Sequence, residues 1–345
     1  MFPSFIPHPL VRGGHAQTVL GCYLPGLKWA PGSQQHLVTL PDGDRIVLHD
    51  DLPNGGKEPD RAALLVHGLG GSHESTYMQR TAAKLVAKGV RVFRMDLRGC
   101  GAGASLAKLP THAGRSDDVG AALAHVMETC ADLPVFLVGF SMGANHVLKL
   151  LGEMGRQRPA NLAGAMAVAP PIDLMDCSRN MERGVNRLYN KSFLRNLLRA
   201  AAIRRQRVPK EFDPPLTPLP RRLREFDERF TAPLGGYSSA DDYYHRASSR
   251  PLLKEIEVPT VVVAAADDPI VPVGPFEAAT YSNSTNLVIV PSGGHLGFFG
   301  VKGADPDRRW MDWRIVEWVT SSALLKHRWK TRFTSPIQTS AAASR

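Results

Sequence analysis

The sequence predicts an α/β fold in which a mostly parallel β-sheet is flanked by helices and carries a helical cap insertion. Short apolar runs of β-forming residues alternate with segments of helical periodicity, which is the pattern of parallel strands joined by helices. The alternation stops between residues 173 and 250, where Arg-rich, helix-forming sequence is punctuated by prolines, and then resumes. An insertion within one α/β unit explains both observations.

The predicted elements follow in order after an irregular, Pro- and Gly-rich start. Residues 36–52 are predicted to form an antiparallel hairpin around a Pro-Asp-Gly-Asp turn. Strands are predicted at residues 62–66, 90–95, 135–138, 164–168, 260–265 and 286–290, and helices at residues 76–88, 116–129, 142–152 and 307–324. Right-handed crossovers bring the carboxyl ends of such strands to one edge of the sheet, where we expect the functional residues.

This order predicts the domain organisation. Residues 1–172 and 251–325 are expected to form one discontinuous core, and residues 173–250 a helical cap or lid over the functional edge of the sheet. Residues 326–345 form a basic stretch that ends in small residues, and we expect a disordered tail there.

Composition and cysteine placement indicate a globular protein in a reducing compartment. The 345 residues are 43% hydrophobic and 21% charged, as in ordinary folded domains. The four cysteines are widely spaced and form neither a CxxC pair nor a dense disulfide framework. Residues 1–10 lack a signal-peptide pattern and no apolar run is long enough to span a membrane, so we expect a cytoplasmic protein.

The net charge of +10 is concentrated in the predicted cap. Residues 179–229 contain 14 Lys and Arg against 6 Asp and Glu. Because the excess is local, we expect no nucleic-acid partner. Six basic residues recur every four positions: Arg179, Arg183, Arg187, Lys191, Arg195 and Arg199. They predict an amphipathic helix whose basic side is either a solvated outer face, the favoured interpretation, or a peripheral contact with an anionic membrane surface.

The motif Gly139-Phe140-Ser141-Met142-Gly143 follows an apolar strand directly and precedes a helical pattern. This strand–turn–helix setting is the one in which GxSxG exposes a nucleophilic serine on a sharp turn. The alternative, a helix N-cap serine, does not require the two glycines. Ser141 is therefore the predicted nucleophile.

A serine hydroxyl needs a base to remove its proton and an acid to orient the base. His295 lies in the Gly-rich stretch Ser292-Gly293-Gly294-His295 after the last strand, and it is the predicted base. The acid follows the strand at 260–265. Asp268 is the preferred candidate and Asp267 the alternative, with a turn as its other role. The order Ser, Asp, His is the one expected for this arrangement.

Acyl transfer also requires backbone N–H groups that stabilise an oxyanion. Met142 follows the nucleophile and supplies the first predicted donor, and Leu69, in the loop His67-Gly68-Leu69-Gly70-Gly71, supplies the second. The alternative for this loop, a phosphate cradle, is disfavoured because neither nucleotide-binding glycine motif is present. No histidine shows metal-ligand spacing, so we predict no metal and no cofactor, and we expect Asp96 to tether its loop.

Several stretches resemble the YheT-like branch of the α/β-hydrolase family: Gly13-Gly14-His15-Ala16-Gln17-Thr18, the loop from His67 to Ser72, Arg98-Gly99-Cys100, the elbow from Gly139 to Asn145, and the loop from Gly293 to Phe298. The resemblance covers roughly residues 5–325, including parts of the cap. It implies an α/β-hydrolase fold, assigns the family's Ser, Asp and His to Ser141, Asp268 and His295, and implies carboxylic ester hydrolysis.

The predicted function is that of a serine esterase, which cleaves small-molecule esters of short to medium acyl chains, or lipid esters, through an acyl-enzyme on Ser141. One alternative is an acyltransferase with the same triad, in which an alcohol or thiol replaces water. The other is a non-catalytic binding or membrane-surface protein on a hydrolase scaffold. The oligomeric state has no signature in the sequence.

Overall fold

An eight-stranded sheet organises the chain. The computed structural model describes residues 2–23, 32–53, 55, 58–206, 214, 217–303 and 305–321. The strands lie in the order β1-β2-β4-β3-β5-β6-β7-β8. Their bounds are β1 (Gln34–Thr39), β2 (Arg45–Asp51), β3 (Arg61–Val66), β4 (Val90–Asp96), β5 (Val135–Phe140), β6 (Leu162–Val168), β7 (Thr260–Ala265) and β8 (Thr285–Val290). The pairs β1–β2 and β2–β4 are antiparallel and all others are parallel.

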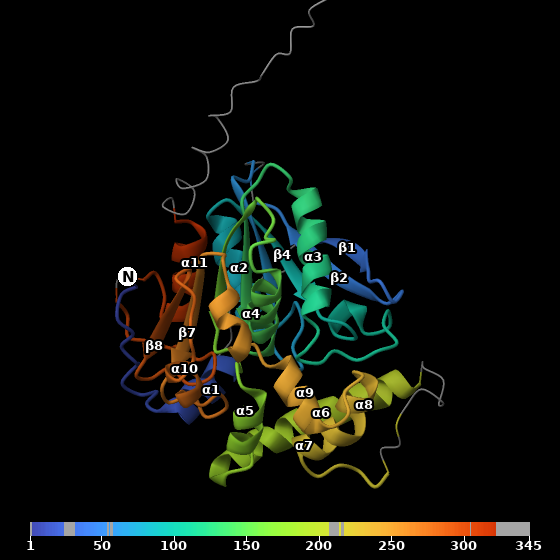
Figure 1. The fold of residues 1–345 in the computed structure, drawn as a ribbon. Helices are drawn as coiled ribbons and strands as arrows, with labels where there is room; N and C mark the ends of the chain where they lie inside the picture. Colours follow the sequence, from blue (N-terminus) through green and yellow to red (C-terminus); the bar gives the residue numbers. More distant parts are fainter. Residues whose placement is uncertain are drawn as a thin grey trace, which may run out of the picture.

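Helices cover both faces of the sheet, which explains why the central strands are buried along their whole length. Successive residues of β3 point to opposite faces. Leu64 packs in the cluster that contains α3 (Ser116–Thr129) and α4 (Met142–Met154), and Leu65 in the cluster that contains α2 (Thr76–Ala87) and α11 (Trp310–Val319). Figure 1 shows these two layers on either side of the strands.

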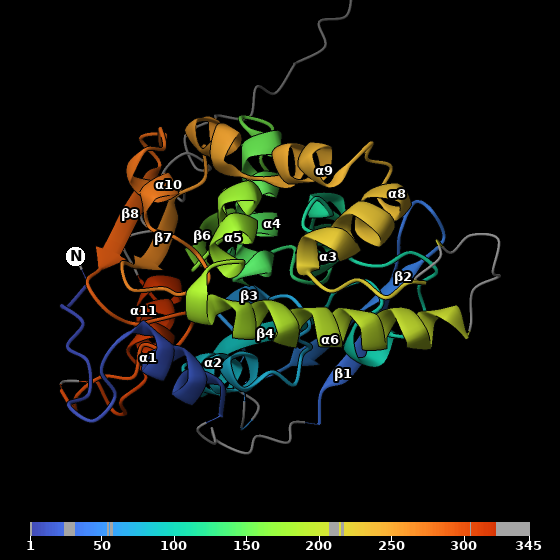
Figure 2. The ribbon, with the colours of Figure 1, turned by 90° about the horizontal axis from the view of Figure 1, so that it is seen from below.

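A group of helices lies between β6 and β7 in the sequence. It comprises α5 (Leu174–Met181), η3 (Gly184–Asn186), α6 (Arg187–Arg205), α7 (Leu223–Phe226), the π-helical turn η5 (Asp227–Thr231), α8 (Ala232–Leu234), α9 (Ala240–Ala247) and η6 (Arg250–Glu255). Figures 1 and 2 show α5 to α9 gathered beyond one end of the strands, with α6 running across that end. Leu194, Ala201, Phe226 and Phe230 form a small apolar cluster of their own there. The division into core and cap domains stays a prediction.

The predicted α/β fold is confirmed, and the predicted strands and core helices are all present. The last helix is shorter than the predicted 307–324, because α11 spans Trp310–Val319, and residues 322–324 lie outside the described residues. The expectation of an irregular N-terminus is wrong, because Gly14–Tyr23 form helix α1. Two adjacent glycines hide the start of this helix, since glycine disfavours helices in isolation. Packing determines it instead: a Cβ on Gly21 would lie 2.6 Å from the Cα of Gly297. The short helix α10 (Gly274–Glu277) was also not expected. The predicted tail, residues 326–345, lies outside the described residues.

The basic side chains of the cap face outward. All six residues of the predicted stripe, from Arg179 to Arg199, are exposed. The prediction of a single amphipathic helix for them is wrong, because Arg179 lies in α5, Arg183 precedes η3, and only the last four lie in α6. Val185 in η3 and Leu188 at the start of α6 are also 61% and 65% exposed. The peripheral contact with an anionic membrane surface stays a prediction. Within the described part of the chain, none of the helices combines the length and apolar character that a membrane crossing requires.

Candidate active site

Ser141 lies on a sharp turn between β5 and α4, with a backbone φ of 51°. A positive φ is unfavourable for a residue with a side chain and is found where the surroundings enforce it. The flanking glycines allow this turn: a Cβ on Gly139 would lie 2.5 Å from the Cα of Ala144, and a Cβ on Gly143 would lie 2.4 Å from the carbonyl oxygen of His67. The elbow therefore depends on both glycines of the motif.

The structure brings Ser141, His295 and Asp268 together in a continuous hydrogen-bonded chain. His295 Nε2 lies 2.8 Å from Ser141 Oγ, and His295 Nδ1 lies 2.8 Å from Asp268 Oδ2. The imidazole and the carboxylate are both buried, whereas Ser141 remains half-buried beside a cavity. With Nδ1–H donated to Asp268, Nε2 is the nitrogen that can accept the serine proton.

The adjacent carboxylates after β7 have separate contacts. Asp268 Oδ1 accepts the backbone N–H groups of Ile270 and Val271, which leaves Oδ2 for His295. Asp267 points to the loop that carries His295, where it accepts Ser292 Oγ–H at 2.8 Å and Gly294 N–H at 2.9 Å. Asp268 thus contacts the imidazole directly, and Asp267 holds the loop that carries it.

Helix α1 packs against the loop that carries His295 and forms hydrogen bonds with it. His295 N–H donates to Thr18 Oγ1 at 2.8 Å, and Thr18 Oγ1–H donates to the carbonyl of Gly14 at 2.7 Å. The fit is close, because a Cβ on Gly294 would lie 2.3 Å from the carbonyl oxygen of Gly14. Gln17 joins the same loop by accepting Phe299 N–H at 2.8 Å. The distinctive N-terminal motif therefore fixes the position of His295.

The two predicted oxyanion donors border the cavity beside Ser141. Met142 is the first residue of α4, so its N–H has no acceptor within the helix. Leu69 belongs to the loop after β3, which approaches the elbow so closely that a Cβ on Gly68 would lie 3.0 Å from the Cβ of Ser141. The Gly68 N–H itself donates to Tyr77 Oη. The placement of Met142 and Leu69 suits the predicted role.

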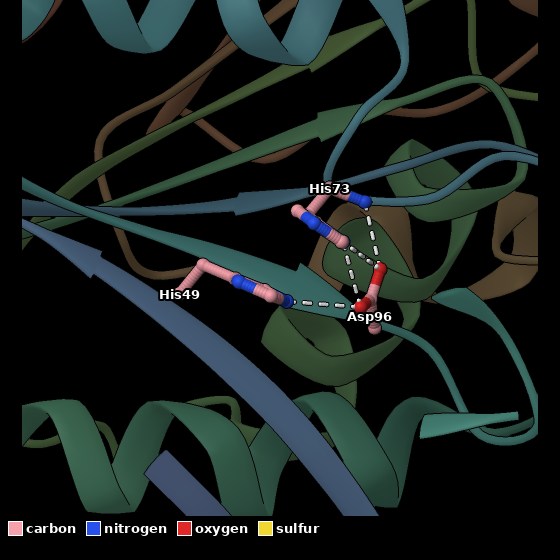
Figure 3. A group of neighbouring side chains, drawn as sticks. All are labelled: His49, His73 and Asp96. Carbon is pink, nitrogen blue, oxygen red and sulfur yellow. Dashed lines mark hydrogen bonds and ion pairs between the residues drawn. The ribbon is translucent and has the colours of Figure 1, made fainter. Parts of the chain in front are cut away.

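Asp96 anchors the loop after β3 from below. Its carboxylate accepts hydrogen bonds from His49 Nε2, His73 Nδ1 and His73 N–H at 2.7 to 3.0 Å (Figure 3). It also accepts Ala102 N–H at 2.9 Å. Burial opposes ionisation, but the hydrogen bonds from His49 and His73 outweigh it and hold the pKa of Asp96 well below its usual range. The expected tethering role of Asp96 is confirmed by these contacts.

The cluster of His49, His73 and Asp96 has ligand-type atoms close enough to suggest a metal site. The two imidazole rings, however, stack with centroids 3.5 Å apart and planes only 12° apart. An imidazole nitrogen binds a metal in the plane of its ring, and one ion cannot lie in both of two nearly parallel planes at this separation. The arrangement fits a hydrogen-bonded anchor and not a metal centre. The sequence could not reveal the cluster, because its members come from three separate segments.

A cavity lies between the carboxyl edge of the sheet and the helices α5 to α9. Ser141, Met142 and Leu69 border it on the sheet side. The opposite wall is largely apolar and includes Leu174, Phe193, Leu197 and Leu223, together with a group of polar side chains around Asp227. An apolar cavity beside a few polar groups is the usual form of a small-molecule site.

The sequence did not predict the places of Thr18 and Asp227 in this site. Thr18 belongs to a distinctive motif, but 277 positions separate it from His295, so no local pattern shows their contact. Asp227 lies in the most basic segment of the chain, near Glu225 and Glu228, where charged residues of both signs suggest a solvated helix face. Its burial, at 6% exposure, is visible only in the folded structure.

Similarity to known proteins extends over most of the chain. Residues 63–300 match the family model of the alpha/beta hydrolase fold. The Escherichia coli (strain K12) protein named "Putative esterase YheT" is 32% identical over 92% of this chain and 93% of its own length. The human protein named "Phospholipase ABHD3" is 30% identical over 83% of this chain and 71% of its own. The solved Pyrococcus furiosus esterase Pf2001 has a TM-score of 0.56 at 16% identity, covering 95% of this chain and 99% of that one, which shows a shared fold.

Proposed function

The chain belongs to the YheT-like branch of the α/β-hydrolase family, and from this premise we propose that it is a serine hydrolase of carboxylic esters. The observation that carries the proposal is the hydrogen-bonded chain from Ser141 through His295 to Asp268 at the edge of a largely apolar cavity. The names of the two relatives, an esterase and a phospholipase, support ester substrates.

The proposed reaction begins when His295 Nε2 takes the hydroxyl proton of Ser141 as Oγ attacks the ester carbonyl carbon. Asp268 keeps the imidazole in the required tautomer and stabilises the imidazolium. The N–H groups of Met142 and Leu69 stabilise the oxyanion. His295 then gives the proton to the leaving alcohol, which departs and leaves an acyl-enzyme. Water, deprotonated by the same imidazole, releases the acid and restores Ser141.

Hydrolysis and acyl transfer share the acyl-enzyme and differ in what attacks it. We expect water to dominate, so that a panel of p-nitrophenyl esters of increasing acyl length yields free acid even when an added alcohol or thiol acceptor is present. Product analysis by chromatography measures the ratio of acid to transfer product. Transfer product in excess over acid at modest acceptor concentrations would replace the esterase proposal by the acyltransferase one. Glycerolipid esters belong in the panel because one relative is named a phospholipase.

Thr18 offers a test of how the base is positioned. Thr18→Val keeps the shape but removes the oxygen that accepts His295 N–H. Since one such hydrogen bond is worth about 1 kcal/mol, we expect kcat for ester hydrolysis to fall about fivefold with little change in KM. Thr18→Ser is the matched control, because it keeps the hydroxyl, and it should restore most of the rate. An unchanged kcat in Thr18→Val together with a loss in Thr18→Ser would show that the methyl packing matters and the hydrogen bond does not.

A further inference from the structure

Asp227 is a polar group in the wall of the cavity beside Ser141 and is separate from the candidate catalytic residues. Asp227, the first residue of the π-helical turn η5, borders this cavity and is 6% exposed. π-Helical turns are rare and frequently occur at functional sites. Burying a carboxyl group in an apolar wall costs free energy unless the group is hydrogen-bonded. The hydrogen bonds that Asp227 already makes therefore indicate which further partner it can bind.

The side chains that bond to Asp227 all donate to it. Thr231 Oγ1–H donates to Oδ1 and Tyr244 Oη–H donates to Oδ2, each at 2.7 Å. Ser178 Oγ–H in turn donates to Tyr244 Oη at 3.3 Å. An ionised carboxylate has about four lone-pair positions, of which these bonds use two. The capacity that remains toward the cavity is therefore that of an acceptor.

A second unused hydrogen-bonding position borders the same cavity. The hydroxyl oxygen of Thr111 is buried, yet it has no hydrogen-bond partner among the residues that the structure describes. Buried hydroxyl groups are rarely left unpaired, and a ligand is one common explanation. Thr111 can both donate and accept, so the same cavity holds a second position at which a polar group of a ligand can be hydrogen-bonded.

Desolvation favours a neutral donor over a cation at Asp227. The guanidinium of Arg224 lies 6.0 Å from the ring of Tyr244 and its positive charge acts on Asp227, but it is paired with Asp241 at 2.8 Å. A substrate ammonium group would lose its hydration on entry into this largely apolar cavity, whereas a hydroxyl group carries a smaller desolvation cost.

We propose that Asp227 is a specificity-determining residue that accepts a hydrogen bond from a hydroxyl group of the substrate, in the cavity where Ser141 attacks the ester. The inference rests on the proposed function. The substrate class is an ester that carries a free hydroxyl on an otherwise apolar chain. The hydroxyl belongs either to the acyl half or to the alcohol half, and matched substrates distinguish the two.

The test uses pairs of esters that differ only by hydroxyl against methyl. Methyl 6-hydroxyhexanoate is compared with methyl heptanoate for the acyl half, and 4-hydroxybutyl butanoate with pentyl butanoate for the alcohol half, by pH-stat titration at pH 8. In one pair we expect kcat/KM to favour the hydroxyl ester about tenfold. A preference for the methyl compound in both pairs would overturn the inference while the hydrolase proposal stands. Absence of hydrolysis and of fluorophosphonate labelling would overturn both.

Substitutions and the pH dependence test whether Asp227 is the residue responsible for the hydroxyl preference. In Asp227→Asn the hydroxyl preference should fall toward one, whereas Glu228→Gln, an exposed neighbour in the same turn, should keep it. Burial raises the pKa of Asp227 to about 6, against the hydrogen bonds from Tyr244 and Thr231. The carboxylate is therefore lost as the pH falls through 6, and the preference in the unaltered protein should drop several-fold between pH 8 and pH 5. Any effect of pH on the hydrolytic step itself is common to both esters of a pair and cancels in their ratio. An unchanged ratio in Asp227→Asn and across this pH range would assign the preference elsewhere.

Discussion

Ser141→Ala should lower kcat for ester hydrolysis by about 10⁴- to 10⁶-fold, because the variant cannot form the acyl-enzyme. His295→Ala should show a loss of similar size, since the hydroxyl at 2.8 Å then has no base. These two residues act as one unit, so the double variant should be no slower than either single variant. Steady-state kinetics with a p-nitrophenyl ester measure all three.

The folded state of these variants provides the control. Thermal unfolding should change little in Ser141→Ala, because the half-buried hydroxyl contributes one side-chain hydrogen bond. A loss of only a few-fold in kcat with an unchanged midpoint would mean that another residue is the nucleophile.

Asp268→Asn should lower kcat by about 10⁴-fold while leaving the fold intact. The amide can donate to His295 Nδ1 and so stabilises the wrong imidazole tautomer, with the proton on Nε2. Asp267→Asn is the matched control, because it removes a charge at the adjacent position. It disturbs only the bonds to Ser292 and Gly294, for which we expect about a tenfold loss. A larger loss in Asp267→Asn than in Asp268→Asn would reverse the assignment of the acid.

Local sequence patterns predicted the parts of this molecule that depend on local chemistry. The elbow at Ser141 is predictable because a strand, two glycines and a helix are consecutive in the sequence. His295 and Asp268 follow from chain order and from their position after strands. Choosing between Asp267 and Asp268 requires side-chain direction, which two adjacent residues in a turn do not reveal. The geometry now separates them, since only Asp268 faces the imidazole.

Contacts between distant segments could not be predicted in this way. Helix α1 forms against the histidine loop, and the role of Thr18 depends on a partner near the other end of the chain. Asp96 joins β2, β4 and the loop after β3 through His49 and His73. Asp227 is buried only because α7, η5 and α9 pack together over the cavity. For Thr18 and Asp96 the determining partners are remote in sequence, and for Asp227 the determining partner Tyr244 lies in a separate helix, so single-sequence periodicity contains no information about these contacts.

Covalent labelling with a fluorophosphonate probe, followed by peptide mass spectrometry, tests the central claim most directly. We predict one stoichiometric phosphonyl adduct on the oxygen of Ser141, formed at a rate that Asp268→Asn and His295→Ala each reduce strongly. A folded protein that stays unlabelled, or whose adduct maps to a residue other than Ser141, would contradict the account.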